Sequence, residues 1–482
     1  MNALLTLPEI AVVALGLGLL LLDLWTPPDQ KRQLGYIAVA GLGLILAATF
    51  TLHGSNPQYA FGQIYVMDGL ALFFKRFFLL GALFVLVMST DFADRFPAGI
   101  GEYYALILFA LAGMMWAASA NDYSLLFVAI ELITISFYVL NSFRRNQADS
   151  LEAGAKYLIL GALASAFLVY GIAFVYGGSG TLSFHPTGPN STDLSLSPIF
   201  QLGLAMVLVG LGFKIAAFPF QIWAPDVYQG SPTPTTAFLA IGSKAAGFVL
   251  LLRVLFSAAP DVATHWRPWW MAVCAITILY GNLGAVPQRN VKRLLGYSSI
   301  AHAGYMLLGV AAMSAAGAAA ILYYLGGYLF TLAAAFTVIC LAFRKSDTGD
   351  LAGLAGLHHR SPFLAATLTL AMVSLAGIPP LAGFFGKFLL LKAVVQRGIT
   401  NPAYYWLVAV ALFGIVVSLY FYLNVVRAIY WSKTRTETAP IEIPRLTRFS
   451  LYGCIAGMLY LGLLPNTFLN WAQEAVKALH LN

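Results

Sequence analysis

The chain has 482 residues, of which 60% are hydrophobic and only 10% are charged, and its mean hydropathy is +0.80. Soluble domains carry about 25% charged residues. A soluble chain this apolar would expose large hydrophobic patches that promote aggregation, so lipid must surround much of it. The net charge of +8 does not indicate nucleic-acid binding, because most lysine and arginine residues stand in short gaps between apolar runs.

The first apolar run, residues 11–22, has the length of a signal-peptide core. Its first charged side chain is Glu9, no basic segment precedes it, and no A-x-A site follows Leu22. A secretory signal needs both of these features. We therefore expect a retained first helix.

The remaining apolar runs predict an all-α polytopic membrane protein, because about 20 apolar residues span a bilayer as a helix. Fourteen transmembrane helices are expected, with centres near residues 16, 44, 80, 110, 131, 166, 207, 245, 276, 303, 330, 375, 415 and 457. Residues 465–482 predict a short interfacial helix. Its apolar side would hold Phe468, Leu469, Trp471, Ala472, Val476 and Leu479.

Charges in the loops support this count and set the orientation. With the N-terminus outside, fifteen of the 27 lysine and arginine residues fall in inside loops, three fall outside, and nine lie within or at the ends of helices. Basic residues favour cytoplasmic loops. We expect both termini on the outer side of the membrane.

No segment outside the apolar runs is large enough to hold a cofactor, and residues 177–198 are typical of a polar surface loop. The chain has no G-x-G-x-x-G turn between strand and helix, no phosphate-binding loop and no cysteine cluster. Cys274, Cys340 and Cys454 lie in separate apolar runs and are expected to pack there. Redox chemistry, nucleotide hydrolysis and a metal site are not expected in this chain.

Several ionisable residues lie deep in apolar runs. They are Glu131, Lys214, Lys244, His302 and Lys387. A charge at the bilayer centre costs at least about 2.5–3.5 kcal/mol. Such residues are retained where they face protein, water or a partner, and a proton pathway would give them a shared purpose.

Simpler interpretations stay open for each of these charges. Lys156 and Lys392 could reach the interface along their own stems, and this is the preferred interpretation for Arg253 and Arg427 at helix ends. His302 could be a hydrogen-bonded packing residue. Glu131 and Lys214 could form a fixed ion pair. The alternative is a switch, in which a movable carboxylate favours the charged lysine when close and the neutral lysine when distant.

Prolines follow or precede two of these lysines. Pro219 comes five residues after Lys214, and Pro379 and Pro380 come before Lys387. Proline leaves a helical carbonyl unpaired, and at membrane depth that group must face protein or water. Helices seven and twelve are therefore predicted to be interrupted, as at ion sites in transporters. A kink without any ion-handling role is the alternative.

The two interrupted helices are five apart, so the layout predicts two inverted five-helix repeats. The expected division is three N-terminal helices in residues 1–100, helices four to eight in 101–260, helices nine to thirteen in 261–435, and the last helix with its tail in 436–482. Glu131 would then correspond to the helix that carries His302.

Three segments resemble the signature of the antiporter-like subunits of complex I. They are GLGFKIAAFPFQIWAPDVYQGSPTP at 210–234, NVKRLLGYSSIAHAGY at 290–305 and SLAGIPPLAGFFGK at 374–387. The resemblance runs through most of the chain. The motif beginning at Asp226 and the absence of a long C-terminal lateral helix are similar to the N type rather than the L or M types.

The resemblance implies a proton path through Glu131, Lys214, Lys244 and Lys387, with Lys156 and His302 as possible additions. Glu131 would modulate Lys214, Lys244 would pass the proton along the midline, and Lys387 would load or release it. NADH, FMN, iron–sulfur clusters and quinone would bind to other subunits. K-type and M-type subunits would be the neighbours, in a bacterial plasma membrane with periplasmic termini.

Two other functions remain open at this level. A subunit of a multi-subunit sodium–proton antiporter would share the fold and work without NADH. A membrane scaffold would hold its charges as fixed pairs.

Overall fold

The structure is a computed structural model that describes residues 3–27, 30–54, 56–96, 99–185, 197–344, 349–432 and 439–480. Its first ten helices are α1 (Leu7–Trp25), α2 (Arg32–Thr49), α3 (Gly69–Phe92), α4 (Ile100–Ala118), α5 (Tyr123–Asn141), α6 (Ala148–Ser179), α7 (Pro198–Ile215), α8 (Trp223–Gly230), α9 (Thr233–Phe238) and α10 (Lys244–Arg253). The other ten are α11 (Pro260–His265), α12 (Arg267–Ala285), α13 (Val291–Ala311), α14 (Ala315–Ala342), α15 (Leu357–Arg360), α16 (Pro362–Ala376), α17 (Ala382–Gly398), α18 (Ala403–Trp431), α19 (Arg445–Leu463) and α20 (Pro465–Val476).

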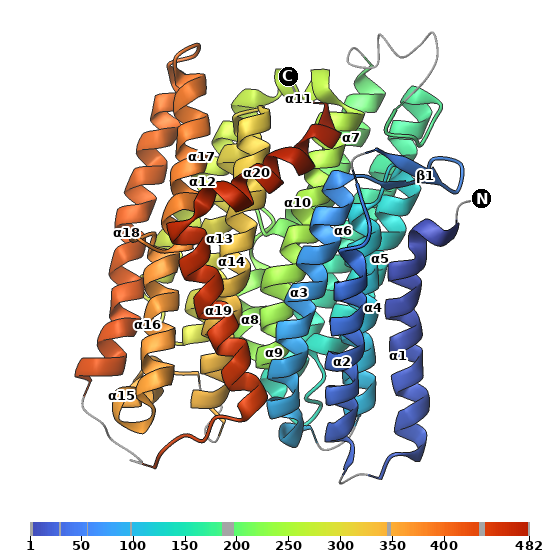
Figure 1. The fold of residues 1–482 in the computed structure, drawn as a ribbon. Coiled ribbons are helices and arrows are strands. Elements are labelled where there is room, and N and C mark those ends of the chain that lie inside the picture. Colours follow the sequence, from blue (N-terminus) through green and yellow to red (C-terminus); the bar gives the residue numbers. More distant parts are fainter. Residues whose placement is uncertain are drawn as a thin grey trace.

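The long helices run side by side in one bundle, and α20 lies obliquely across it near one end (Figure 1). Wider helical turns at Leu239–Ser243 and Val254–Ala258 join α9 to α10 and extend α10, so 233–258 is one continuous helical rod. α1 begins and α20 ends at the same end of the bundle (Figure 1).

The all-α membrane architecture predicted from the sequence is confirmed. Among the described residues, twelve helices are long and apolar enough to cross a membrane. α12 and α16 are outside that set: α16 has only 15 residues, and α12 carries Arg267, Tyr280 and Asn282. The count of fourteen, the four-part division and the inverted repeat remain predictions.

Burial separates central from peripheral helices. The rod 233–258 is 100% buried over its most apolar window, and α13 and α14 are each 94% buried. α1, α2, α6, α18 and α19 are at most 33% buried, and their outer faces carry large apolar side chains such as Trp406 and Phe413 on α18. Apolar exposure on this scale fits lipid rather than water. The central helices hold the polar residues described below.

A small β-hairpin is one of the elements that the sequence analysis missed, together with the short helices α11 and α15. β1 (Gln58–Ala60) pairs antiparallel with β2 (Tyr65–Met67), with Tyr59 opposite Val66. Three-residue strands are too short to show the alternation that identifies strands in a sequence. The Val66 N–H donates to the carbonyl of Ser119 at 2.9 Å, which fastens the hairpin to the end of α4.

The C-terminal helix predicted for 465–482 is formed by α20 and a short turn, Lys477–Leu479. Ala472, Val476 and Leu479 are buried, as predicted for its apolar side. The ring of Phe468 lies 5.7 Å from that of Phe73 on α3 and 5.8 Å from that of Tyr323 on α14. α20 is therefore packed on the bundle. Residues 481–482 lie outside the described chain.

Candidate functional site

Lys214 is buried in the last turn of α7 and faces neutral oxygens. Its ammonium donates to the Thr134 hydroxyl on α5 and lies 3.4 Å from the Tyr157 hydroxyl on α6. Glu131, one turn before Thr134, is partly buried and accepts a hydrogen bond from Ser165 on α6. No ion pair joins Glu131 to Lys214 in the structure as described, so the fixed pair considered from the sequence is not formed.

The end of α7 explains where Lys214 lies. Ala216 adopts a left-handed backbone with φ of 57°, and the N–H of Ala217 donates to the Gly212 carbonyl at 2.9 Å. Trp223 reaches back from α8 and donates through Nε1 to the Phe213 carbonyl at 3.0 Å. These donors satisfy carbonyls that the helix leaves open. Pro219 lies in the segment 216–222 between α7 and α8.

Lys244 begins α10 and is also buried without a carboxylate partner in the described structure. Its ammonium contacts the carbonyl and the hydroxyl of Ser299 on α13. The Ser299 hydroxyl lies 2.8 Å from the Tyr228 hydroxyl on α8. No hydrogen bond among the described side chains joins Lys244 to Lys214, although a Cβ at Gly247, one turn on, would lie 3.2 Å from the Lys214 Cβ.

Lys387 on α17 turns back onto the end of α16. Its Nζ donates to the carbonyls of Leu375 at 2.8 Å and Ala376 at 3.0 Å, and it lies 5.0 Å from the centre of the Tyr305 ring. Pro379 and Pro380 occupy the segment 377–381 between the two helices. The helix dipole favours a positive charge at a helix C-terminus. The C-terminal end of α16 therefore binds the ammonium of Lys387.

His302 is buried on α13 between two tyrosines. Nδ1 contacts the Tyr324 hydroxyl, and Nε2 lies 2.9 Å from the Tyr422 hydroxyl. A cavity of about 10 Å³ lies beside the imidazole and is also lined by Thr331 and Ser374, and this is close to the space that one water occupies. The ring is thus hydrogen-bonded on both sides, as the packing interpretation also requires.

α13 connects the sites of Lys244 and Lys387. Four of its residues make these contacts in turn. Ser298 contacts Tyr422, and Ser299 contacts Lys244. His302 contacts two tyrosines, and the ring of Tyr305 contacts Lys387. Positions 298, 302 and 305 recur at helical spacing on one face. A buried polar row therefore runs along α13, one of the central helices.

Lys156 differs from the other three lysines. Its side chain is 40% exposed and forms ion pairs of 2.6 Å with Glu152 and with Asp226. Asp226 also binds Arg293 on α13. The lysine therefore belongs to a partly exposed charge network, and its inclusion in a buried path remains a prediction.

Two buried ion pairs were missed from the sequence. Lys75 on α3 and Glu9 on α1 are both fully buried, with Nζ and Oε1 2.8 Å apart. Arg253 was expected to reach the interface, and this was wrong: it is 3% exposed, and its two terminal nitrogens donate to Asp68 at 2.9 and 3.1 Å. The first pair could have been suspected from the sequence, because Glu9 and Lys75 have opposite charges and lie in separate apolar runs.

The described residues contain no group of three or more His, Cys, Asp or Glu side chains that could hold a metal ion. The buried polar sites of Lys214, Lys244, His302 and Lys387 consist instead of amines, hydroxyls, one imidazole and main-chain carbonyls. Groups of these types can donate, accept and relay protons. The chain is built around ionisable side chains inside a membrane bundle, as in ion-translocating membrane proteins.

Comparison with known proteins identifies the family. Residues 120–418 match the model of the NADH:quinone oxidoreductase/Mrp antiporter transmembrane family, and the chain belongs to that family. NADH-quinone oxidoreductase subunit N of Moorella thermoacetica is 40% identical over 97% of both chains, and that of Desulforamulus reducens is 38% identical over 98% of this chain and 97% of its own. Within the family, the chain is of the subunit N type.

Solved structures agree with this placement. A chain of respiratory complex I from Thermus thermophilus with bound aureothin has a TM-score of 0.81 and 36% identity, covering 96% of this chain and 99% of its own. A chain of the Mrp complex from Dietzia sp. has a TM-score of 0.84 at 22% identity, covering 100% of this chain and 98% of its own. The second likeness shows a shared fold only.

Proposed function

We propose that this chain is a proton-translocating subunit in the membrane arm of NADH-quinone oxidoreductase. Electron transfer from NADH to quinone would occur in other subunits and drive protons through this one. The observation that carries the proposal is the set of three buried lysines, Lys214, Lys244 and Lys387, each held by neutral oxygens. A buried ammonium without a counter-charge is costly, so its charge can be removed or restored by a modest change nearby.

Each residue is assigned a role in the proposed proton path, of which the polar row of α13 is one part. Glu131 would modulate Lys214 by moving toward or away from it, and its present partner, Ser165, holds it on the α6 side. Lys244 would pass the proton onward through Ser299 of α13. Lys387 would load or release it at the break between α16 and α17.

His302 is the proposed relay between Lys244 and Lys387. It stands on the same helix as Ser299 and Tyr305, which contact those two lysines. Its two tyrosine partners give each ring nitrogen a neighbour through which a proton can be exchanged. Lys156 would serve the inner end of α6 through Asp226.

The cellular setting follows from the same assignment. The membrane would be a bacterial plasma membrane with both termini in the periplasm, and K-type and M-type subunits would flank the chain. NADH, FMN, iron–sulfur clusters and quinone would be bound elsewhere in the complex. The sodium–proton antiporter function is disfavoured because the Mrp likeness is 22% identical, whereas the relatives named subunit N reach 40%.

Substitution of Lys214 tests the function. In the assembled complex, Lys214→Met should lower NADH-driven proton pumping severalfold, because no titratable group would remain at the end of α7. Lys392→Met, at an exposed position on α17, is the matched control and should pump normally.

Acidification by inverted membrane vesicles supplied with NADH measures pumping, and NADH oxidation is followed in parallel. Normal pumping by Lys214→Met in an assembled complex would favour the scaffold. Sodium sensitivity of cells lacking the gene, with NADH-driven pumping intact, would favour the antiporter.

A further inference from the structure

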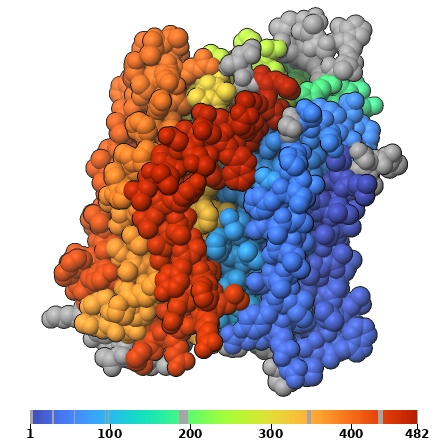
Figure 2. All heavy atoms as spheres, viewed as in Figure 1, coloured from blue at the N-terminus to red at the C-terminus, as the bar shows by residue number. Residues whose placement is uncertain are grey.

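An apolar groove lies below α20, between α19 on one side and α2 and α3 on the other (Figure 2). Its volume is about 320 Å³, within the range of small-molecule sites. Leu46 of α2, Leu80 of α3, Leu329 of α14 and Gly457 of α19 line its four sides. The groove therefore opens sideways, where the bundle faces lipid.

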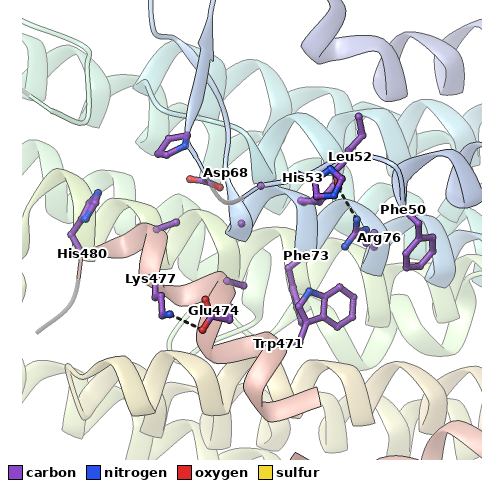
Figure 3. Close-up of a pocket in the computed structure, with 16 residues that line it drawn as sticks. Phe50, Leu52, His53, Asp68, Phe73, Arg76, Trp471, Glu474, Lys477 and His480 are labelled. Carbon is purple, nitrogen blue, oxygen red and sulfur yellow. Dashed lines mark hydrogen bonds and ion pairs between the residues drawn. The ribbon is translucent and has the colours of Figure 1, made fainter. Parts of the chain in front are cut away.

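A second cavity, of about 690 Å³, adjoins the groove, and Figure 3 shows the residues that line it. Its lining combines apolar residues with six polar ones, and we call it the polar chamber because of these six: His53, Asp68, Arg76, Glu474, Lys477 and His480. Both cavities share four lining residues: Phe50, Phe73, Arg76 and Trp471. A polar chamber thus continues into an apolar groove past these four side chains.

Arg76 stands at this junction with spare donors. Its Nη2 donates to the carbonyls of Thr49 at 2.8 Å and Leu52 at 3.1 Å, and its Nε is buried without a hydrogen-bond partner in the described structure. The guanidinium lies 4.7 Å from the ring centre of Phe50 and 5.7 Å from that of Trp471. The arginine is held in place, and its Nη1 has no hydrogen-bond partner in the described structure.

The charges around the polar chamber leave Arg76 unmatched. Asp68 is neutralised by Arg253, and Glu474 is neutralised by Lys477 at 2.6 Å. No carboxylate pairs with Arg76 within the described chain. The net charge of the cavity therefore favours an anion, and the Nη1 group of Arg76, which has no hydrogen bond in the described structure, can donate charge-assisted hydrogen bonds to a phosphate.

We propose that the two cavities together bind one anionic phospholipid. Its phosphate would accept hydrogen bonds from Arg76 in the polar chamber, and an acyl chain would lie along the groove past Leu80 and Leu329. α20, an amphipathic helix packed across the bundle, would lie at the level of the headgroup. The partition between polar and apolar parts matches the two ends of a lipid.

The shape of the groove favours a lipid over a transmembrane helix of another subunit. A helix with side chains is about 10–12 Å wide, and one running along the groove would meet α20 across its end (Figure 2). A flexible chain can pass beside Trp471 where a helix cannot. The lipid would also fill the apolar gap between α19 and α3, so it would connect the C-terminal helices to the N-terminal ones.

Photolabelling tests the site. The full chain is placed in nanodiscs of phosphatidylcholine with a small fraction of phosphatidylglycerol that carries a diazirine in one acyl chain, and the adducts are mapped by peptide mass spectrometry. Leu80→Trp fills the groove, and Arg76→Gln removes the charge. Leu412→Trp and Arg427→Gln, at exposed positions of α18, are the matched controls.

We expect wild-type adducts to concentrate on peptides of α3 and α14, and both groove variants to lower that yield at least about five-fold, as loss of a charge-assisted contact or of the binding space would. The controls should label as wild type does. If Leu80→Trp lowers the unfolding temperature, Leu46→Trp replaces it from the opposite wall. Adducts no denser in the groove than on exposed α18, or groove variants that label like their controls, would overturn the proposal. So would cross-linking of Leu80→Cys to another subunit in the assembled complex.

Discussion

Glu9 and Lys75 form an ion pair with no exposed surface on either side chain. Nζ of Lys75 also reaches the Tyr65 hydroxyl and the Met67 sulfur of the hairpin, the latter at 3.5 Å. Burying two opposite charges contributes little net stability, but removing one leaves the other stranded. Removing one member of the pair should therefore lower stability far more than removing both.

Glu9→Gln should lower the free energy of unfolding by about 3–5 kcal/mol, because the Lys75 ammonium would stay buried without its counter-charge. The double substitution Glu9→Gln with Lys75→Met should recover much of that loss. Unfolding of the detergent-solubilised chain, followed by tryptophan fluorescence, measures both. The exposed pair Glu474–Lys477 supplies the control, and Glu474→Gln should change stability by no more than about 1 kcal/mol. Equal effects of Glu9→Gln and Glu474→Gln would contradict the expectation.

At the scale of elements, the contact between α16 and α17 depends on one glycine. A Cβ at Gly383 would lie 1.8 Å from the carbonyl oxygen of Ser374, a main-chain atom that cannot swing away. The same turn places Lys387 four residues further along α17, with its amine on the last carbonyls of α16. The position of the amine is therefore tied to how closely the two helices approach.

Gly383→Ala should destabilise the chain by about 1–3 kcal/mol, the usual cost of overpacking, and should lower proton pumping because α17 must shift with Lys387 on it. Gly43→Ala, on the outer part of α2 where a Cβ meets nothing within 4 Å, should leave both unchanged. Thermal unfolding and vesicle acidification distinguish the two variants. Wild-type stability and pumping of Gly383→Ala would contradict the expectation that the close approach of α16 and α17 positions Lys387.

The elements best predicted from the sequence were those that hydrophobicity alone defines. Long apolar runs located the rod 233–258 and the helices α13 and α14, and the amphipathic pattern located α20. Lys214 was expected beside Glu131; it contacts α5 and α6, and Glu131 lies on α5 with its carboxylate bonded to α6. Its true partners, Thr134 and Tyr157, could not be predicted, because hydroxyls are common in apolar runs and carry no periodic signal.

Long-range pairing was the main gap. Arg253 and Asp68 are 185 positions apart, and only the folded arrangement shows that the arginine is enclosed rather than at the lipid surface. The sequence did show a charge near a helix end, and such charges usually reach the interface. The hairpin that carries Tyr65 was missed because its strands are short, and its anchor, Ser119 at the end of α4, is likewise far away in the sequence.

For the whole molecule, the arrangement of the ends agrees with the charge bias. The bundle has α1 beginning and α20 ending on one side (Figure 1), and an even number of crossings requires this. The five-fold excess of basic residues in the loops assigned to the inside predicts that this common side is the outer one. Orientation is therefore open to a direct test.

Alkaline phosphatase fused after residue 480 should be active, because it folds only outside the cytoplasm, and green fluorescent protein at the same point should stay dark. Fusions after Arg145, in the loop between α5 and α6, should give the reverse result, with fluorescence and no phosphatase activity. Fluorescence from a fusion after residue 480 would mean that the number of crossings is odd or that the orientation is inverted.

The two hydrogen bonds from Lys387 to the end of α16 affect how the amine can change its charge. A primary amine that gives up a proton still has two N–H bonds, one for each of the carbonyls of Leu375 and Ala376. The helix end thus keeps both donors whether the nitrogen is positive or neutral, and the scaffold need not rearrange when the proton leaves. Arginine would hold its charge permanently, and a carboxylate would repel both oxygens, so lysine is suited to this position by what it retains after deprotonation.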